Sequence, residues 1–233
     1  MDYAAYQCRY AAVPPNGFSN LWYSYDHGAA HYVNIDSEED QSPASPQAQW
    51  LAADLARAAA NRAAVPWIIL VQHRPVYSST KSEAGSHLPG GGFAAVLEPY
   101  LKQYKVDLFL TGHQHQCAYI FLRARRQTHP ALTHQRPTRA ADERMHPVMN
   151  GTVASVGING TYTNPGAPVY VVQGTAGAFV TGDWMEPQPA WSAFREGVSY
   201  GYGRMRIQGA ARRTYDYVSI EGKVLDHFEL VKA

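Results

Sequence analysis

Residues 106–115 read Val-Asp-Leu-Phe-Leu-Thr-Gly-His-Gln-His. An apolar run of strand length stops at a glycine, and two histidines follow it. Residues 67–75, Trp-Ile-Ile-Leu-Val-Gln-His-Arg-Pro, have the same plan, because an apolar run again ends in polar residues. A strand that is buried on both faces has this composition. The two stretches therefore predict two buried strands that each end in histidine.

The segment between these strands predicts a helix. Phe93, Leu97 and Leu101 recur at helical spacing within residues 93–104. Pro99 cannot donate a backbone hydrogen bond, so the helix is either kinked or begins late, with Pro99 near its N-terminus. Strand, helix and strand together predict a βαβ unit with parallel strands and a right-handed crossover.

Three histidines follow the ends of the two strands. In α/β sheets, functional groups gather beyond the carboxyl ends of the strands, which makes His73, His113 and His115 candidates for one shared site. Neutral imidazole suits Zn, Fe, Mn and related metals. The alternative is that they are polar loop residues, because the chain has ten histidines and some fall at strand ends by chance. The residues alone leave both interpretations open.

Most of the remaining elements are predicted strands. Residues 21–25 and 30–35 flank a turn and predict a hairpin. Ser45 is a good N-cap before Pro46, which predicts a helix that runs to about Ala60. Further strands are predicted at 169–173, 203–207, 215–220 and 223–231. The pattern as a whole predicts an α/β chain.

Two segments lack any regular pattern. Residues 1–20 are expected to be irregular. Residues 120–142 place five arginines among prolines and histidines without periodicity. This composition predicts a basic, disordered insertion within a single unit that covers residues 1–233.

Composition excludes several classes of protein. The 233 residues are 45% hydrophobic, which predicts a packed core. Their formal net charge of +1 does not indicate electrostatic attraction of the whole chain to nucleic acid or membrane. No apolar run reaches the roughly 18 residues that a membrane helix needs. The first ten residues do not predict a signal peptide. Cys8 and Cys117 either pair with each other or are both free.

Several motifs occur in an order that one family shares. Residues 112–115 match a Gly-His-x-His motif, and residues 70–73 match a Val-x-x-His motif in which Leu70 replaces the valine. Further similar stretches are 21–26, 169–177, 191–196 and 200–203. Together they resemble the purple acid phosphatases, a branch of the calcineurin-like metallophosphoesterases. The resemblance covers nearly all of the chain except 120–142, and it implies the C-terminal half of a metallophosphoesterase β-sandwich with flanking helices.

The resemblance also implies a binuclear metal site of Fe(III) beside Zn, Mn or Fe(II). By motif, His115 would bind the ferric iron, and His73 and His113 would bind the divalent metal. The family's other ligands come from Asp-x-Gly, Gly-Asp-x-x-Tyr and Gly-Asn-His-Asp/Glu motifs, which this sequence does not contain. At most one metal is therefore expected on this chain alone.

The activity that the resemblance implies is hydrolysis of phosphate monoesters at acidic pH. A second hypothesis is a non-catalytic fragment that binds one metal or a partner protein, which the missing ligand motifs favour. A third is a phosphodiesterase or nucleotide pyrophosphatase of the same superfamily, although the motifs after residue 168 favour the phosphatase. His87 lies where the family often places substrate-binding histidines, and its alternative is a solvated loop histidine.

Other features concern the origin of the chain. Asn150 and Asn159 begin two glycosylation sequons, which favours a secreted ancestry. A secreted or lysosomal or vacuolar location is expected from the family, and a sequon without a signal peptide hints at a missing N-terminus. Joining Tyr119 to Glu143 would restore a Tyr-Glu-Arg continuation similar to the family's, so we expect 120–142 to be an inserted or mis-spliced segment. The oligomeric state is not predicted.

Overall fold

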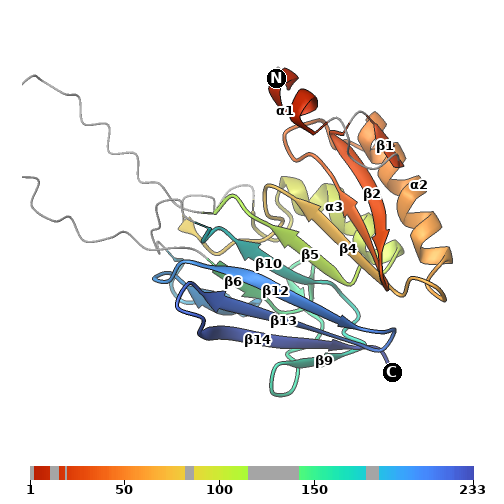
Figure 1. Ribbon diagram of the computed structural model, residues 1–233. Coiled ribbons are helices and arrows are strands. Elements are labelled where there is room, and N and C mark those ends of the chain that lie inside the picture. Colours follow the sequence, from red (N-terminus) through yellow and green to blue (C-terminus); the bar gives the residue numbers. More distant parts are fainter. Residues whose placement is uncertain (1–2, 11–15, 19, 82–86, 115–141, 177–183) are drawn as a thin grey trace, which may run out of the picture.

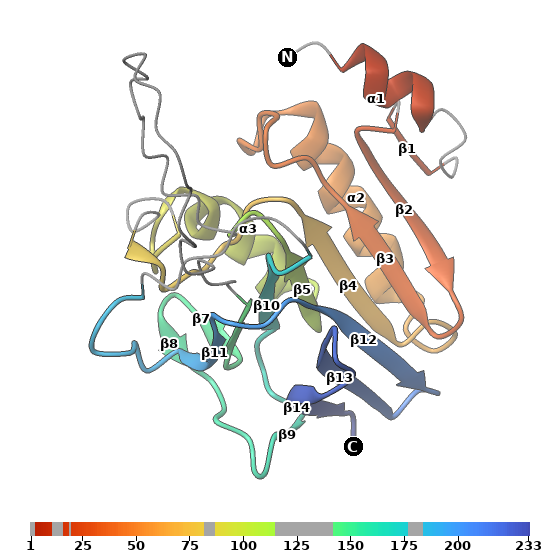
Figure 2. The same cartoon turned by 60° about the vertical axis from the view of Figure 1, so that its left-hand side comes forward.

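The structure is a computed structural model that describes residues 3–10, 16–18, 20–81, 87–114, 142–176 and 184–233. Within these residues a larger and a smaller β-sheet lie face to face, and two helices cover the other face of the larger sheet (Figures 1 and 2). The order across the larger sheet is β1 (Asn16–Phe18), β2 (Trp22–His27), β3 (Ala30–Asn34), β4 (Trp67–Gln72), β5 (Leu108–Thr111), β10 (Val169–Gln173), β6 (Asp142–Met145) and β11 (Ser192–Glu196). The smaller sheet contains β12 (Gly201–Gln208), β13 (Arg212–Ser219), β14 (Val224–Val231) and β9 (Thr161–Thr163). A separate pair is β7 (Val148–Met149) with β8 (Thr152–Val153), and the helices are α1 (Ala4–Arg9), α2 (Pro46–Ala60) and α3 (Gly92–Gln103).

Strands β4 and β5 lie at the centre of the larger sheet and confirm the two predicted buried strands. They run parallel, with Leu70 opposite Phe109. Leu70 and Phe109 pack in the core beneath the helices, whereas Ile69 and Leu108 pack against the smaller sheet. Because both faces are covered, both strands are continuous apolar runs in the sequence.

The parallel strands bring the predicted histidine positions to one edge. β3 pairs in parallel with β4, and β10 pairs in parallel with β5. Gln72 lies opposite Thr111, so the residues that follow β4 and β5 leave the sheet side by side. The βαβ arrangement therefore positions the candidate site.

The two predicted helices are present. At α2, Ser45 has extended backbone dihedral angles, and its hydroxyl accepts a 3.1 Å hydrogen bond from the Ala48 N–H, which confirms the predicted cap. Helix α3 begins at Gly92 and continues through Pro99, so the late start considered for it is wrong. Leu97 and Leu101 on α3 are buried against the sheet, and this packing keeps the helix continuous across the proline.

The predicted hairpin and the predicted late strands are also present. Strands β2 and β3 pair antiparallel with Tyr25 opposite Tyr32. Strands β12, β13 and β14 follow one another antiparallel, and β14 pairs in parallel with β9 at Glu229 and Thr161. Strands β12 and β13 begin two and three residues earlier than predicted, because backbone pairing extends past the alternating apolar positions, whereas β14 begins one residue later than predicted.

The expectation of an irregular N-terminal segment is wrong for part of it. Helix α1 has six residues, too few for a periodic pattern to show in the sequence. Strand β1 pairs with β2, with Gly17 opposite Tyr23, so its conformation depends on the backbone of another strand. Cys8 is exposed and has no disulfide partner among the described residues. Cys117 lies outside them.

The predicted insertion at 120–142 lies outside the described residues except for its last position. Asp142 is the first residue of β6, pairs with Gln173 and is buried. Of the proposed junction between Tyr119 and Glu143, Tyr119 also lies outside the described residues, whereas Glu143 lies on β6. In the described residues, no helix is long and apolar enough to cross a membrane.

Candidate metal centre

His73 and His113 lie together beyond the ends of β4 and β5. The Gly112 N–H donates to the His73 carbonyl oxygen over 3.1 Å, which ties the two chain segments just outside the sheet. The Nδ1 atom of His113 is 3.0 Å from the Nε2 atom of His73, and the two ring planes are nearly perpendicular at 81°. The structure therefore brings these two predicted ligands together, whereas His115 lies outside the described residues.

The spacing of the two ring nitrogens suits a shared metal ion. Imidazole ligands lie about 2.0–2.1 Å from a metal such as Zn²⁺, so two of them on one ion have nitrogens about 3 Å apart. No group of three or more His, Cys, Asp or Glu side chains in the described residues is arranged to hold a metal. The described pair thus fits part of a metal site, and further ligands must come from elsewhere.

His87 is buried beside this pair. Its side chain is 0% exposed, its ring stacks on Phe93, and its ring centroid is 6.1 Å from that of His113. The Nδ1 atom lies 2.5 Å from the Pro75 carbonyl oxygen. A carbonyl only accepts hydrogen bonds, so Nδ1 carries the proton and the ring orientation is fixed. The alternative that His87 is a solvated loop histidine is wrong.

Two buried glutamates hold the loop that follows His73. The Tyr77 hydroxyl donates to Glu98 of α3, which also accepts a 2.9 Å hydrogen bond from the Asn150 N–H. Glu143 on β6 accepts 2.9 Å and 2.6 Å hydrogen bonds from the backbone N–H and the hydroxyl of Ser79. The loop is therefore attached to the core at two points between His73 and residue 80.

The Glu143 carboxylate has further partners. It accepts a 2.5 Å hydrogen bond from the Ser192 hydroxyl, and the Arg195 guanidinium lies 3.9 Å away. Burial raises the pKa of Glu143, and the hydrogen bonds from Ser192 and Ser79 oppose that effect. From the sequence, Glu143 could be noticed only as part of a Tyr-Glu-Arg continuation similar to the family's. Its structural role could not be predicted, because its hydrogen-bond partners lie far from it along the chain.

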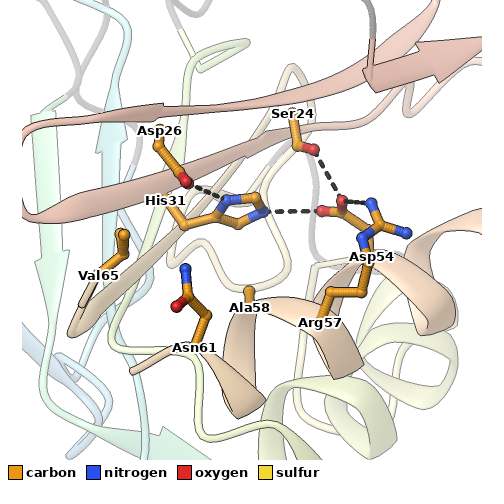
Figure 3. Close-up of a pocket in the computed structure, with 8 residues that line it drawn as sticks. All are labelled: Ser24, Asp26, His31, Asp54, Arg57, Ala58, Asn61 and Val65. Carbon is orange, nitrogen blue, oxygen red and sulfur yellow. Dashed lines mark hydrogen bonds and ion pairs between the residues drawn. The ribbon is translucent and has the colours of Figure 1, made fainter. Parts of the chain in front are cut away.

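A different pocket, of about 460 Å³, lies at the opposite end of β3 and β4 from His73 (Figure 3). His31 stands there between two carboxylates, with Nδ1 2.6 Å from Asp26 and Nε2 2.9 Å from Asp54. The fully buried Asp54 also accepts hydrogen bonds of 2.7 Å from Ser24 and 2.5 Å from Arg57. The polar groups are thus paired with one another, which indicates a structural connection between the hairpin and α2.

Comparisons with known proteins agree with this fold. The family model of the calcineurin-like phosphoesterases matches residues 1–117, and that of "Iron/zinc purple acid phosphatase-like protein C" matches residues 167–227. The chain belongs to the calcineurin-like phosphoesterase family, within its purple acid phosphatase group.

Individual relatives are similar over most of the chain. Acid phosphatase type 7 of Mus musculus is 30% identical over 99% of this chain and 50% of its own length. Purple acid phosphatase 1 of Ipomoea batatas is 28% identical over 88% of this chain and 39% of its own length. The solved purple acid phosphatase PPD1 of yellow lupin shares the fold, with a TM-score of 0.73 at 22% identity over 94% of this chain and 34% of its own. The chain thus spans half or less of the length of these relatives.

Proposed function

We propose that this chain supplies the histidine ligands of a binuclear metal centre in a phosphatase that hydrolyses phosphate monoesters at acidic pH. His115 would hold Fe(III), and His73 and His113 would hold Zn, Mn or Fe(II). The observation that carries the proposal is the 3.0 Å approach of the two ring nitrogens. One relative, from Arabidopsis thaliana, is named Fe(3+)-Zn(2+) purple acid phosphatase 12, which supports this choice of metals.

The chain's own side chains would divide the work. When bound, the metals supply Lewis acidity toward the phosphoryl group and lower the pKa of water. His73 and His113 present nitrogen ligands from a fixed backbone. His87 would bind a phosphate oxygen through its ring, whose orientation is fixed by the contact of Nδ1 with the Pro75 carbonyl oxygen. No covalent step is assigned to the chain.

The second candidate is a non-catalytic chain that holds a single metal on its histidines or binds a partner protein. The missing motifs for the Asp, Tyr and Asn ligands favour it. The remaining ligands would then have to come from residues that this sequence does not contain, as its missing motifs predict. Under the first candidate, residues 1–233 would act as the C-terminal part of a metallophosphoesterase catalytic domain.

Exposed turns support the proposal of a glycosylated, secreted or vacuolar protein. Asn150 and Asn159 are both exposed and have positive φ angles of 48° and 49°. Each is followed by glycine and threonine, so both sequons lie on tight turns at the surface. A glycan at either position would project into solvent.

Metal analysis and a p-nitrophenyl phosphate assay at pH 5 test these candidates. Two metals per chain with turnover would support the binuclear phosphatase, and one metal without turnover would support the second candidate. We expect His113→Ala to abolish binding of the divalent metal, because it removes one of two converging nitrogens. The matched control is His27→Ala, an exposed histidine at the end of β2 and near the other end of the sheet, which should leave occupancy unchanged. Equal occupancy in both variants would contradict the assignment.

A further inference from the structure

The backbone at His113 has an unusual conformation. Its φ angle is 68°, in the left-handed region that non-glycine residues seldom adopt. The N–H of the next residue, Gln114, donates to the carbonyl oxygen of Gly112 over 2.8 Å. A positive φ with a hydrogen bond between residues i and i+2 defines a γ-turn of the rare, strained kind. Such a conformation persists only where the surrounding structure holds it in place.

Hydrogen bonds flank the turn on both sides. On one side the Gly112 N–H is bonded to the His73 carbonyl oxygen. On the other, the side chain of Gln114 is buried at 2% exposure, and its Oε1 atom accepts a 2.8 Å hydrogen bond from the Thr80 hydroxyl. The Gln114 side chain is held in the core. Because Gln114 follows His113 directly, this contact also restricts the direction of the His113 side chain.

Thr80 is itself held by a buried polar chain. Its hydroxyl is 3.0 Å from the Ser78 hydroxyl, and its neighbour Ser79 is bonded twice to Glu143. The carbonyl oxygen of Ser79 accepts a 2.7 Å hydrogen bond from the Met185 N–H. Glu143 lies on β6, which is separated from β4 by β5 and β10 in the sheet. The strained turn is therefore attached, through Thr80 and Ser79, to a distant strand.

We propose that Gln114 and Thr80, anchored by Glu143, are positioning residues that hold His113 in its γ-turn, with Nδ1 directed at Nε2 of His73. The inference deepens the proposed function, because the arrangement is useful only if the two nitrogens share a ligand. None of the three residues touches the metal or the substrate. Their effect is geometric, since an unheld turn would relax to negative φ and rotate the imidazole away.

The test uses Thr80→Val, which removes the hydroxyl and keeps the shape of the side chain. The matched control is Ser24→Ala. It also removes a buried hydroxyl, but this one lies at the opposite end of the sheet and donates to the Asp54 carboxylate. Zn²⁺ binding by calorimetry and the visible spectrum of bound Co²⁺ report the metal site. Loss of a group that orients a metal ligand lowers metal affinity by about tenfold to a hundredfold. We expect about tenfold for Thr80→Val, an altered Co²⁺ spectrum, and neither change for Ser24→Ala.

A second readout does not need a metal. The three-bond coupling between the amide and Cα protons of His113 reports its φ angle directly by NMR. We expect Thr80→Val to change this coupling, and Thr80→Ser, which restores a hydroxyl, to return it to the wild-type value. Glu143→Gln disturbs the same anchor one step further along and provides the test if Thr80→Val does not fold.

The outcomes separate this inference from the proposed function. If the wild-type chain binds no Zn²⁺, the proposed metal site is contradicted, and the coupling constant alone decides the positioning role. An unchanged His113 coupling in both Thr80→Val and Glu143→Gln would overturn the inference. Equal loss of Zn²⁺ affinity in Thr80→Val and Ser24→Ala would do the same, because the effect would then be general destabilisation.

Discussion

At the residue scale, His31 connects the β2–β3 hairpin to α2 through charge. Burial alone lowers the pKa of His31, but hydrogen bonds and charges of Asp54 and Asp26 outweigh burial, and its pKa is raised. The other charged group that faces this cluster is Arg57, which is paired with Asp54. His31 is therefore an imidazolium between two carboxylates over a wider range of pH than an ordinary histidine.

This protonation makes stability depend on pH. The contribution of a histidine with a raised pKa is fully present below the pKa of the unfolded residue, about 6.5, and is lost as pH rises through the folded pKa. We expect His31→Asn to lower the free energy of unfolding by about 1–2 kcal/mol at pH 5 and by clearly less at pH 9. Urea unfolding of both chains at several pH values measures the difference. A loss that is equal at pH 5 and pH 9 would contradict the bridging role.

At the scale of single elements, the predictions that succeeded depended on local chemistry. The cap at Ser45 and the apolar runs of β4 and β5 are set by residues within a few positions of each other. Helix α1 and strand β1 were missed because one is too short for a periodic pattern and the other depends on pairing with β2. Helix α3 runs through Pro99 because packing of its apolar face outweighs the lost hydrogen bond.

The candidate site divides in the same way. His73 and His113 could be predicted, since the ends of neighbouring parallel strands meet at one edge of a sheet. The burial of His87 and the support from Glu143 could not be predicted, because both depend on contacts between distant segments. Gln114 occupies the variable position of the Gly-His-x-His motif, and its side chain is buried and hydrogen-bonded. A buried polar side chain in a loop leaves no periodic trace in the sequence.

The cap of α2 gives a test at this scale. Replacing an N-cap serine by alanine removes an acceptor for the first turn and costs about 1 kcal/mol. We expect Ser45→Ala to lower the free energy of unfolding by that amount in urea. Ser45→Asp is the matched control, because aspartate caps a helix about as well as serine does, and it should retain the stability of the wild type. A comparable loss in both variants would show that the cap is not the cause.

At the scale of the whole molecule, one buried ion pair joins the two sheets. Arg144 on β6 of the larger sheet makes two hydrogen bonds, of 2.7 Å and 2.9 Å, to Asp226 on β14 of the smaller sheet. It also donates a 2.6 Å hydrogen bond to the Tyr162 hydroxyl on β9. The Arg144 and Asp226 side chains are only 10% and 8% exposed, so their charges are shielded from water. This contact fixes the smaller sheet over β6.

Breaking the pair should be costly. Removing one partner of a buried ion pair leaves the other charge uncompensated, which costs about 3–5 kcal/mol. We expect Asp226→Asn to lower the free energy of unfolding by about 3 kcal/mol. The control is Arg204→Met, which removes a partner of Asp216 within the smaller sheet, where Arg204 is 39% exposed and the expected loss is under about 1 kcal/mol. Chemical unfolding compares the two, and similar losses would mean that the inter-sheet pair has no special role.

The loop that follows His73 is anchored by Glu143, and this anchoring affects the order in which the site can form during synthesis. His73 and His113 precede Glu143 and Ser192 along the chain, and a ribosome releases N-terminal segments first. Glu143, which accepts the hydrogen bond from Ser79, therefore leaves the ribosome only after both histidines. Ser192, which also donates to Glu143, leaves later still. A nascent chain would carry its histidines well before it could hold them in place. Under the proposed function, competence to bind metal would therefore be acquired late in synthesis, when β6 and β11 have joined the sheet.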